Sequence, residues 1–315
     1  MQEILKLKPV FQERIWGGTK LKEYFSYNTT SDLTGECWAI SAHKNGDCII
    51  ENGVYKGRFL SEVYSENRKL FRGSESPVFP LLVKILETSA SLSVQVHPDD
   101  EYALMNEDEL GKSECWYIIA CEKDSEVVIG HQARTKDELI RRIDEGEWDR
   151  LLNKIKVEPG DFFYIPSGTI HAVGEGIILL EIQQPSDTTY RIHDYDRVDQ
   201  DGKRRELQIE KAKDVATVLP TDLDLHVKVR KDKNLTVTRY LSSIYFTVEK
   251  WEADGEAAIP LEEFTLVSVI GGQGEINGTV ARKGDHFILT SLCKEARLSG
   301  DLEISACWID RISCR

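Results

Sequence analysis

Short apolar runs, bounded by turn or charged residues, dominate this chain. In its first 200 residues they lie at 38–42, 81–86, 91–97, 115–121, 127–129 and 177–183. Runs of this length, rich in β-branched and aromatic residues, are typical of strands, whereas helices need longer periodic segments. The pattern therefore predicts an all-β-dominated fold.

Helical patterns are few. The segment Thr135–Glu138 forms a capping box, which predicts a helix running through Ile143. A second short helix is predicted over 148–152. We expect the segment from about 99 to 155 to be a helical insertion that packs against the outside of a barrel.

A last helix is predicted from about residue 207, and Pro220 stops it. Beyond about residue 225 strand runs return at 246–248 and 264–270. Asn277-Gly278 is a strong signal for a two-residue hairpin turn.

A sequence segment late in the chain resembles an earlier one. Arg282–Leu289 reads Arg-Lys-Gly-Asp-His-Phe-Ile-Leu, which echoes Val157–Pro166, Val-Glu-Pro-Gly-Asp-Phe-Phe-Tyr-Ile-Pro. The echo predicts two copies of one β-unit. We expect a metal-binding domain over residues 1–225 and a second, degenerate domain over 226–315.

Composition and charge narrow the possible partners. The chain has 315 residues and a formal net charge of −14, which argues against nucleic acid or an anionic membrane as a partner. Its seven cysteines form no Cys-x-x-Cys pair, which favours reduced thiols and a cytoplasmic location. The charged N-terminus does not resemble a signal peptide, and no apolar run is long enough to span a membrane. The oligomeric state is left open, and a monomer fits the sequence.

Two short motifs predict a metal site. Gly160–His171 is a glycine, five residues, Pro-Ser-Gly, two residues and a histidine, which is the second half of the cupin signature. Upstream, Gln95 and His97 stand two residues apart and so share one face of a strand, and Glu114 follows. Two histidines, a carboxylate and an amide oxygen suit zinc or a similar divalent ion and leave room for water or substrate. In the second copy Thr290–Lys294 replaces the end of the motif, so we expect one ion per chain and two cupin units.

Five longer sequence motifs show a more specific resemblance. The motifs are Trp16-Gly-Gly, Gly35–Ser41, Leu92–Asp99, Gly160–His171 and Glu181–Arg197. With them the chain resembles the type I mannose-6-phosphate isomerases, in their short bacterial form. This family is zinc-dependent and interconverts mannose 6-phosphate and fructose 6-phosphate.

The resemblance implies roles for individual residues. Gln95, His97, Glu114 and His171 match the metal ligands of the family, and Arg191 matches its active-site arginine. Lys84 and Ser93 match residues of the substrate pocket. We add Glu181, Asp187 and Trp16 as candidate substrate-binding residues.

The chemistry of the reaction agrees with these roles. Aldose–ketose isomerisation moves a proton between C1 and C2 through a cis-enediol, and a divalent ion beside O1 or O2 stabilises the negative charge that develops. Arg191 stays protonated, so we assign it to charge stabilisation or substrate orientation. The proton carrier stays open among Lys84, Glu181, Asp187 and a water on the metal. Candidates for holding the phosphate are Arg191, Lys84, Lys112 and Arg134.

Two alternatives remain. The first is another metallo-cupin enzyme, such as a dioxygenase or a sugar-phosphate isomerase of different specificity. Those usually carry His-x-His, and Gln95 in this position disfavours iron and oxygen chemistry. The second is a non-catalytic, carbohydrate-binding protein of two cupin units, which would not need the polar residues from Asp187 to Arg191.

Overall fold

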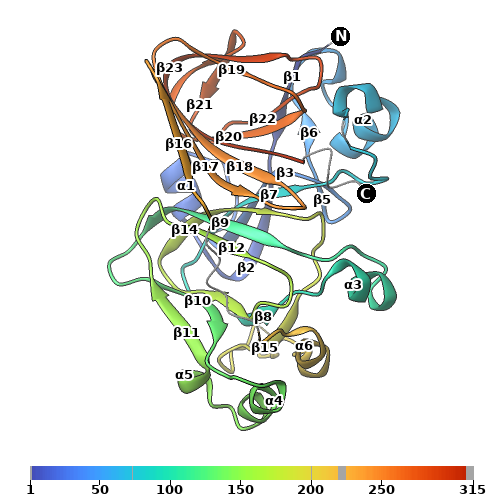
Figure 1. The fold of residues 1–315 in the computed structure, drawn as a ribbon, viewed down its shortest axis with the longest axis vertical. Helices are drawn as coiled ribbons and strands as arrows, with labels where there is room; N and C mark the ends of the chain where they lie inside the picture. Colours follow the sequence, from blue (N-terminus) through green and yellow to red (C-terminus); the bar gives the residue numbers. More distant parts are fainter. Residues whose placement is uncertain (1, 73, 200, 219–224, 310–315) are drawn as a thin grey trace.

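The structure, a computed structural model, describes residues 2–72, 74–199, 201–218 and 225–309. Strands form two barrels, one above the other in Figure 1. The all-β-dominated fold predicted from the sequence is confirmed. None of the helices in the described part of the chain is long and apolar enough to cross a membrane.

The N-terminal barrel consists of two facing sheets. One has the strand order β12-β9-β14-β7-β3-β2, and the other has the order β11-β10-β13-β8-β15. The strands of the first sheet are β2 (Val10–Gly18), β3 (Thr34–Ile40), β7 (Leu82–Glu87), β9 (Glu114–Cys121), β12 (Phe162–Ile165) and β14 (Ile177–Gln183). Those of the second are β8 (Val94–Val96), β10 (Glu126–His131), β11 (Leu152–Lys156), β13 (His171–Val173) and β15 (Tyr190–His193).

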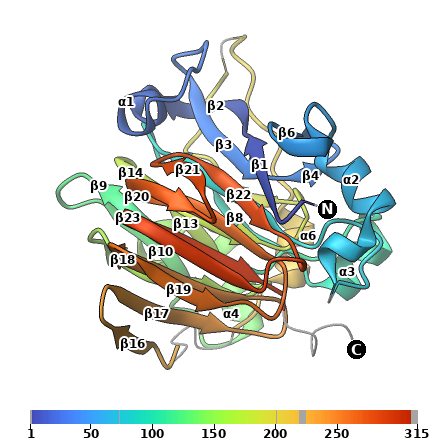
Figure 2. The same cartoon turned by 90° about the horizontal axis from the view of Figure 1, so that it is seen from above.

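The C-terminal barrel is one continuous set of strands in the order β16-β17-β18-β23-β20-β22-β1-β6, with β19 paired to β23 and β21 to β20. Figure 2 shows the run from β16 to β1 side by side. The strands are β1 (Ile4–Lys8), β6 (Ile49–Ile50), β16 (Lys228–Asp232), β17 (Leu235–Ser242), β18 (Thr247–Asp254), β19 (Ala257–Pro260), β20 (Thr265–Ile276), β21 (Thr279–Arg282), β22 (His286–Leu289) and β23 (Glu295–Trp308).

The predicted division of the chain at residue 225 does not separate the two barrels. Strands β1 and β6 lie in the N-terminal part of the chain, yet β1 pairs with β22, and β6 pairs with β1. Two strands from the first fifty residues therefore complete the C-terminal barrel. Sequence patterns did not reveal this exchange, because pairing between distant strands leaves no local signal.

The predicted repeat is present as a shared turn. Gly160 and Gly284 both have a positive φ, 99° and 90°. The aspartate after each glycine closes the same turn, since its side chain accepts a hydrogen bond from the backbone N–H three residues before it. Its backbone carbonyl accepts from Ile118 of β9 in one barrel and from Val269 of β20 in the other. The two units therefore share a backbone framework.

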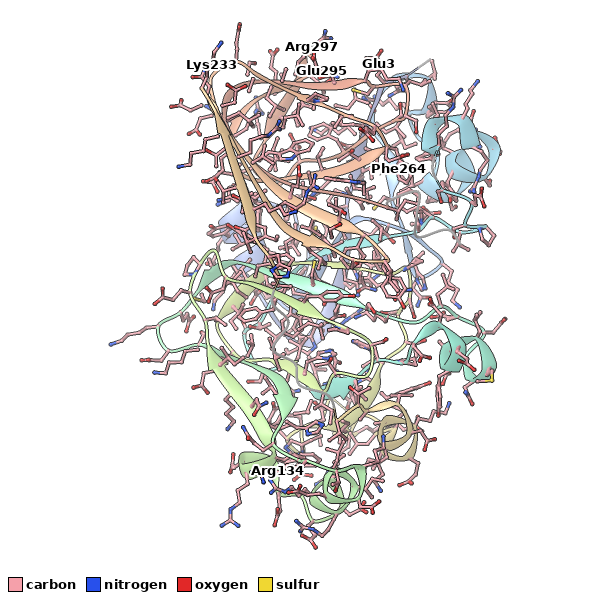
Figure 3. All side chains as sticks on the ribbon, in the orientation of Figure 1. Glu3, Arg134, Lys233, Phe264, Glu295 and Arg297 are labelled. Carbon is pink, nitrogen blue, oxygen red and sulfur yellow. The ribbon has the colours of Figure 1, made fainter. Side chains whose placement is uncertain are left out.

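Apolar side chains fill three layers. Trp116 and Leu179 belong to the interior of the N-terminal barrel, and Trp251 belongs to that of the C-terminal barrel. A third cluster joins the barrels, because β7, β9 and β14 turn their other faces toward β18, β20 and β22. Phe264, labelled in Figure 3, extends this junction by packing its ring against those of Phe71 and Phe79.

The capping-box helix is confirmed as α4 (Lys136–Asp144), where the Thr135 side chain accepts from Glu138 N–H. Helix α4 packs on the outer face of the N-terminal barrel together with α5 (Trp148–Leu151) and α6 (Ile209–Val215). The expected helical insertion over 99–155 is wrong in extent, because this stretch also supplies β9 and β10. The predicted stop of the last helix, Pro220, lies outside the described residues.

The remaining elements are short. They are the helices α1 (Lys20–Phe25), α2 (Leu60–Glu66) and α3 (Asp100–Asn106), the 3-10 turns η1 (Gly53–Tyr55) and η2 (Arg68–Phe71), and the strand pair β4 (Ala42–His43) and β5 (Gly46–Asp47). The hairpin at Asn277-Gly278 joins β20 to β21 with a positive φ at both residues, 49° and 73°, as a type I′ turn requires.

Candidate metal centre and the cluster around it

Three predicted ligands meet inside the N-terminal barrel. His97 directly follows β8, Glu114 begins β9 and His171 begins β13. Their ligand atoms all lie within 4.8 Å of one another, and all three residues are buried. Glu114 Oε2 is 3.4 Å from His97 Nε2, and Glu114 Oε1 is 3.6 Å from His171 Nε2. Two imidazoles and a carboxylate that converge in this way form a possible site for a divalent metal ion.

The register of the sheet places the fourth predicted ligand beside them. Gln95 of β8 is directly opposite His171 of β13, and on its other side it pairs with Arg191 of β15. The amide nitrogen of Gln95 is 3.3 Å from His171 Nε2. A half-turn of the amide would present its oxygen to an ion at the same place. The prediction of Gln95 as a ligand is therefore compatible with the geometry.

Backbone carbonyls fix the orientation of both imidazole rings. His97 Nδ1 lies 2.9 Å from the carbonyl oxygen of Thr188, and His171 Nδ1 lies 2.8 Å from that of Thr169. A carbonyl can only accept, so each Nδ1 carries the proton and donates it. Each Nε2 then keeps its lone pair toward Glu114, which is the tautomer that binds a metal.

Electrostatics favour the same protonation states. Burial, aided by the charge of Lys112, lowers the pKa of His97 to about 3, and burial also lowers the pKa of His171. Burial alone would raise the pKa of Glu114, but the charge of Lys112 acts against it, and that pKa lies well below its ordinary value. At neutral pH the cluster thus offers two neutral imidazoles and an ionised carboxylate, the forms that metal binding needs.

Lys112 belongs to the centre of this cluster. Its Nζ donates to Glu114 Oε2 at 2.5 Å and lies 3.3 Å from His97 Nε2 and 3.8 Å from Glu181 Oε1. From the sequence, Lys112 is expected only as a possible phosphate ligand. Its position two residues before Glu114, hence on the same face of an extended segment, was the available signal.

Lys84 and Glu181 form a second charged pair at the same end of the barrel. They are direct partners across β7 and β14, and Lys84 Nζ is 3.6 Å from Glu181 Oε1 and 3.8 Å from Asp187. Trp116 joins this pair to the ligand group, since its Nε1 donates to Glu114 at 3.0 Å and to Glu181 at 3.2 Å. Burial and the charge of Glu114 raise the pKa of Glu181. Lys84 is therefore an interior residue of the site and not an edge lysine.

A tryptophan contacts Lys84 from the other side, and a carboxylate fixes that tryptophan. The Lys84 ammonium lies 4.9 Å from the centre of the Trp38 ring, within the range of a cation–π contact. Glu36 accepts from Trp38 Nε1 at 2.7 Å and from Arg14 at 2.8 Å. Because Glu36 and Trp38 share one face of β3, one strand supplies both residues.

Arg191, Ser93 and Trp16, which were also predicted as site residues, differ in how deeply they are buried. Arg191 is half-buried, and burial together with the charge of Arg205 lowers its pKa. Its Nε is buried and makes no hydrogen bond within the described part of the chain. Ser93 is buried just before β8, whereas Trp16 is buried in the apolar interior of the barrel. Roles for these residues in substrate binding stay predictions.

Comparison with known proteins identifies the family to which this chain belongs. The model of the type I phosphomannose isomerase catalytic domain matches residues 4–117, and that of the mannose-6-phosphate isomerase cupin domain matches residues 236–307. The chain is 51% identical to mannose-6-phosphate isomerase ManA of Bacillus subtilis, over 96% of this chain and 97% of the relative. The chain belongs to the type I phosphomannose isomerases. It is also 49% identical to a mannose-6-phosphate isomerase of Streptococcus mutans, over 97% of this chain and 98% of the relative.

Solved structures of phosphomannose isomerases have the same fold. The crystal structure of the mannose 6-phosphate isomerase from Bacillus subtilis superposes with a TM-score of 0.95 at 45% identity, covering 98% of this chain and all of the other, 100%. A variant of the Salmonella typhimurium phosphomannose isomerase reaches a TM-score of 0.80 at 15% identity, which shows the fold alone. The resemblance inferred from the sequence is thereby confirmed.

A polar clamp outside the cluster fixes the loop that holds His97. Glu109 accepts from Thr188 Oγ1 at 3.1 Å and pairs with Lys44 at 2.8 Å. The backbone carbonyl of the same Thr188 receives the Nδ1 proton of His97. Glu109 therefore acts on the predicted ligand His97 through Thr188.

Arg134, another candidate for holding the phosphate, projects beside α4 at the foot of the N-terminal barrel in Figure 3.

Proposed function

We propose that this chain is a zinc-dependent aldose–ketose isomerase that interconverts mannose 6-phosphate and fructose 6-phosphate. The observation that carries the proposal is the buried cluster in which His97, Glu114 and His171 converge beside Lys84 and Glu181. A divalent-metal site next to paired acid and base groups suits proton transfer beside a carbonyl. Membership of the type I phosphomannose isomerases supports the choice of substrate.

We assign one zinc ion to the N-terminal barrel, with His97, Glu114, His171 and Gln95 as its ligands. The donor set fits zinc because both imidazoles keep Nε2 free of protons and the carboxylate is ionised. When bound, the ion would act as a Lewis acid on a carbonyl or hydroxyl oxygen of the sugar.

Glu181 is the proposed proton carrier. It is buried, and its pKa is raised by burial and by the charge of Glu114, which brings a carboxyl group closer to the pH at which it can both take and give a proton. Lys84, 3.6 Å away, stabilises the ionised state and can donate to a sugar oxygen. Glu181 takes the proton from C2 of mannose 6-phosphate and returns it to C1, while the hydroxyl proton of O2 passes to O1. The reverse reaction uses the same groups.

Arg191 stabilises the negative charge of the enediolate. It is a neighbour of Gln95 across the β8–β15 pair, and its buried Nε donates to no group among the described residues. A guanidinium stays protonated at neutral pH, so it acts as a fixed cation rather than as a base. Asp187, 3.8 Å from Lys84, lies at the rim, where it would orient hydroxyl groups.

A coupled assay of fructose 6-phosphate formation from mannose 6-phosphate tests the proposal on the zinc-loaded protein. We expect turnover that is lost on chelation and restored by zinc. Turnover of glucose 6-phosphate in place of mannose 6-phosphate would favour an isomerase of different specificity. Oxygen uptake with bound iron would favour a dioxygenase, and sugar binding without any turnover would favour a non-catalytic protein.

A further inference from the structure

The C-terminal barrel has a cavity of its own. It has a volume of about 760 Å³, within the range of small-molecule sites. It opens between β16 and β17 on one side and the segment that leads from β19 into β20 on the other. No step of the proposed isomerase reaction uses it.

The shared turn shows that this cavity lies where the other barrel holds its metal centre. Ile118 and Val269 make the same hydrogen bond to the turn. Four residues before them stand Glu114 and Thr265, and Thr265 lines the cavity. The mouth of this barrel is thus kept open, although the predicted metal ligands of the other barrel are replaced.

Strand pairing extends the correspondence. Lys84 of β7 follows Val83, which pairs with Ile182 of β14. In the C-terminal barrel Glu249 of β18 follows Val248, which pairs with Cys307 of β23. A buried, charged side chain therefore projects into each mouth from the corresponding strand.

The cavity has a rigid polar wall. Glu249 accepts from Arg239 Nε at 2.9 Å and from Trp251 Nε1 at 2.7 Å. Arg239 is also fixed against the Trp308 ring, 5.7 Å from its centre. The Arg239 side chain is 45% exposed, so it can still donate to a ligand in the cavity.

The remaining charges define the ligand. Lys228 and Arg230 of β16 line one side, and Glu262 and Glu263 line the other, so that with Arg239 and Glu249 the cavity carries three cations and three carboxylates. This balance gives no net attraction for a phosphate dianion. It offers both donors and acceptors to hydroxyl groups, next to the aromatic ring of Trp308.

We propose that the C-terminal barrel binds an uncharged sugar at this cavity, separately from the metal centre. A single hexose of about a dozen heavy atoms should bind with a dissociation constant in the millimolar range. Its hydroxyl groups accept from Arg230 and Arg239 and donate to Glu262.

Ligand-observed NMR titration of D-mannose against the zinc-loaded, full-length protein tests this site. We expect saturable binding that persists after chelation of the zinc. Arg230→Gln should weaken it about tenfold or more, since a charged hydrogen bond is lost. Lys231→Gln is the matched control, because Lys231 is the next residue of β16 and does not line the cavity. Both variants should keep the isomerase activity and the melting temperature of the wild type.

Three results would overturn the proposal. They are the absence of saturable binding, loss of binding on chelation, which would place the sugar at the metal centre, and equal binding by the two variants. Displacement of mannose by inorganic phosphate would also contradict it, because the cavity would then select anions. None of these results depends on whether the metal centre isomerises mannose 6-phosphate.

Discussion

The two barrels have the same turn and corresponding strands, yet among the described residues only the N-terminal barrel brings together a possible metal site. Where the N-terminal barrel has Glu114, the C-terminal barrel has Thr265 at the corresponding position. The framework depends on Gly160 or Gly284, the following aspartate and the apolar interior, none of which is a ligand. The fold and the site are therefore specified by separate sets of residues.

The barrels also differ in how they hold charge. At the N-terminal mouth Lys112, Glu114 and Glu181 are all buried, so each depends on its neighbours to stay ionised. At the C-terminal mouth Arg239 is 45% exposed and, among the described residues, pairs with the carboxylate of Glu249. The N-terminal cluster can therefore tune proton affinities, whereas the C-terminal one provides fixed donors and acceptors.

The largest expected effect separates the two barrels. His171→Ala should lose the metal and reduce kcat by at least about a thousandfold, because Lewis-acid stabilisation is typically worth several kcal/mol. Thr265→Ala, at the position of the C-terminal barrel that corresponds to Glu114, should change neither. Steady-state kinetics and metal analysis of both variants check this. An equal loss in Thr265→Ala would remove the distinction between the barrels.

Arg191→Ala should reduce kcat by about 100- to 1000-fold, since it removes a fixed cation from the place where negative charge develops. Zinc content and melting temperature should stay those of the wild type. Arg191→Lys should recover only part of the rate, because lysine lacks the planar donor fork. If Arg191→Ala loses activity only by unfolding, the arginine is structural.

Glu109→Ala tests the polar clamp that fixes Thr188 in the N-terminal barrel. Without the carboxylate, Thr188 is no longer held, and His97 loses its fixed orientation. Loss of such an outer partner typically weakens metal affinity about 10- to 100-fold. Competition with a chromophoric chelator measures the affinity. Glu109→Gln, which keeps an acceptor for Thr188, should restore most of it, and an unchanged affinity in Glu109→Ala would show that the clamp is dispensable.

The smallest effect concerns a histidine at the junction between the barrels. Burial, together with the charge of Lys6, lowers the pKa of His286 to about 3, and its ring contacts Tyr27 and Ser268. Below pH 6.5 or so the unfolded chain binds a proton at this position that the folded chain does not, so stability falls as the pH falls toward 3. His286→Gln should remove this loss, about 1.4 kcal/mol per pH unit.

Denaturant unfolding of the wild type and His286→Gln between pH 6 and 4.5 checks the difference. Other buried histidines contribute equally to both proteins, so the gap between the two curves reports on His286 alone. Parallel curves would mean that His286 is protonated in the folded state as well.

Local patterns sufficed to predict much of the fold and the grouping of three candidate ligands. The capping box at Thr135, the hairpin at Asn277 and the repeated Gly-Asp turn each depend on neighbouring residues, which a sequence displays directly. His97, Glu114 and His171 could be proposed together because short motifs fix their spacing.

What the sequence did not reveal depends on contacts between distant segments. Lys112 also lies 3.8 Å from Glu181 on another strand, which its spacing from Glu114 does not reveal. Strand β1 enters the far barrel by pairing with β22. Pairings of this kind follow from three-dimensional register and leave no local mark.

The number of zinc ions bound by the pure protein tests the central claim most directly. Inductively coupled plasma mass spectrometry, after dialysis against metal-free buffer, should give close to one zinc per chain. The N-terminal barrel alone would hold it, since the one group of three converging ligands among the described residues is His97, Glu114 and His171. Two tightly bound ions per chain, or full activity after thorough chelation, would contradict the account.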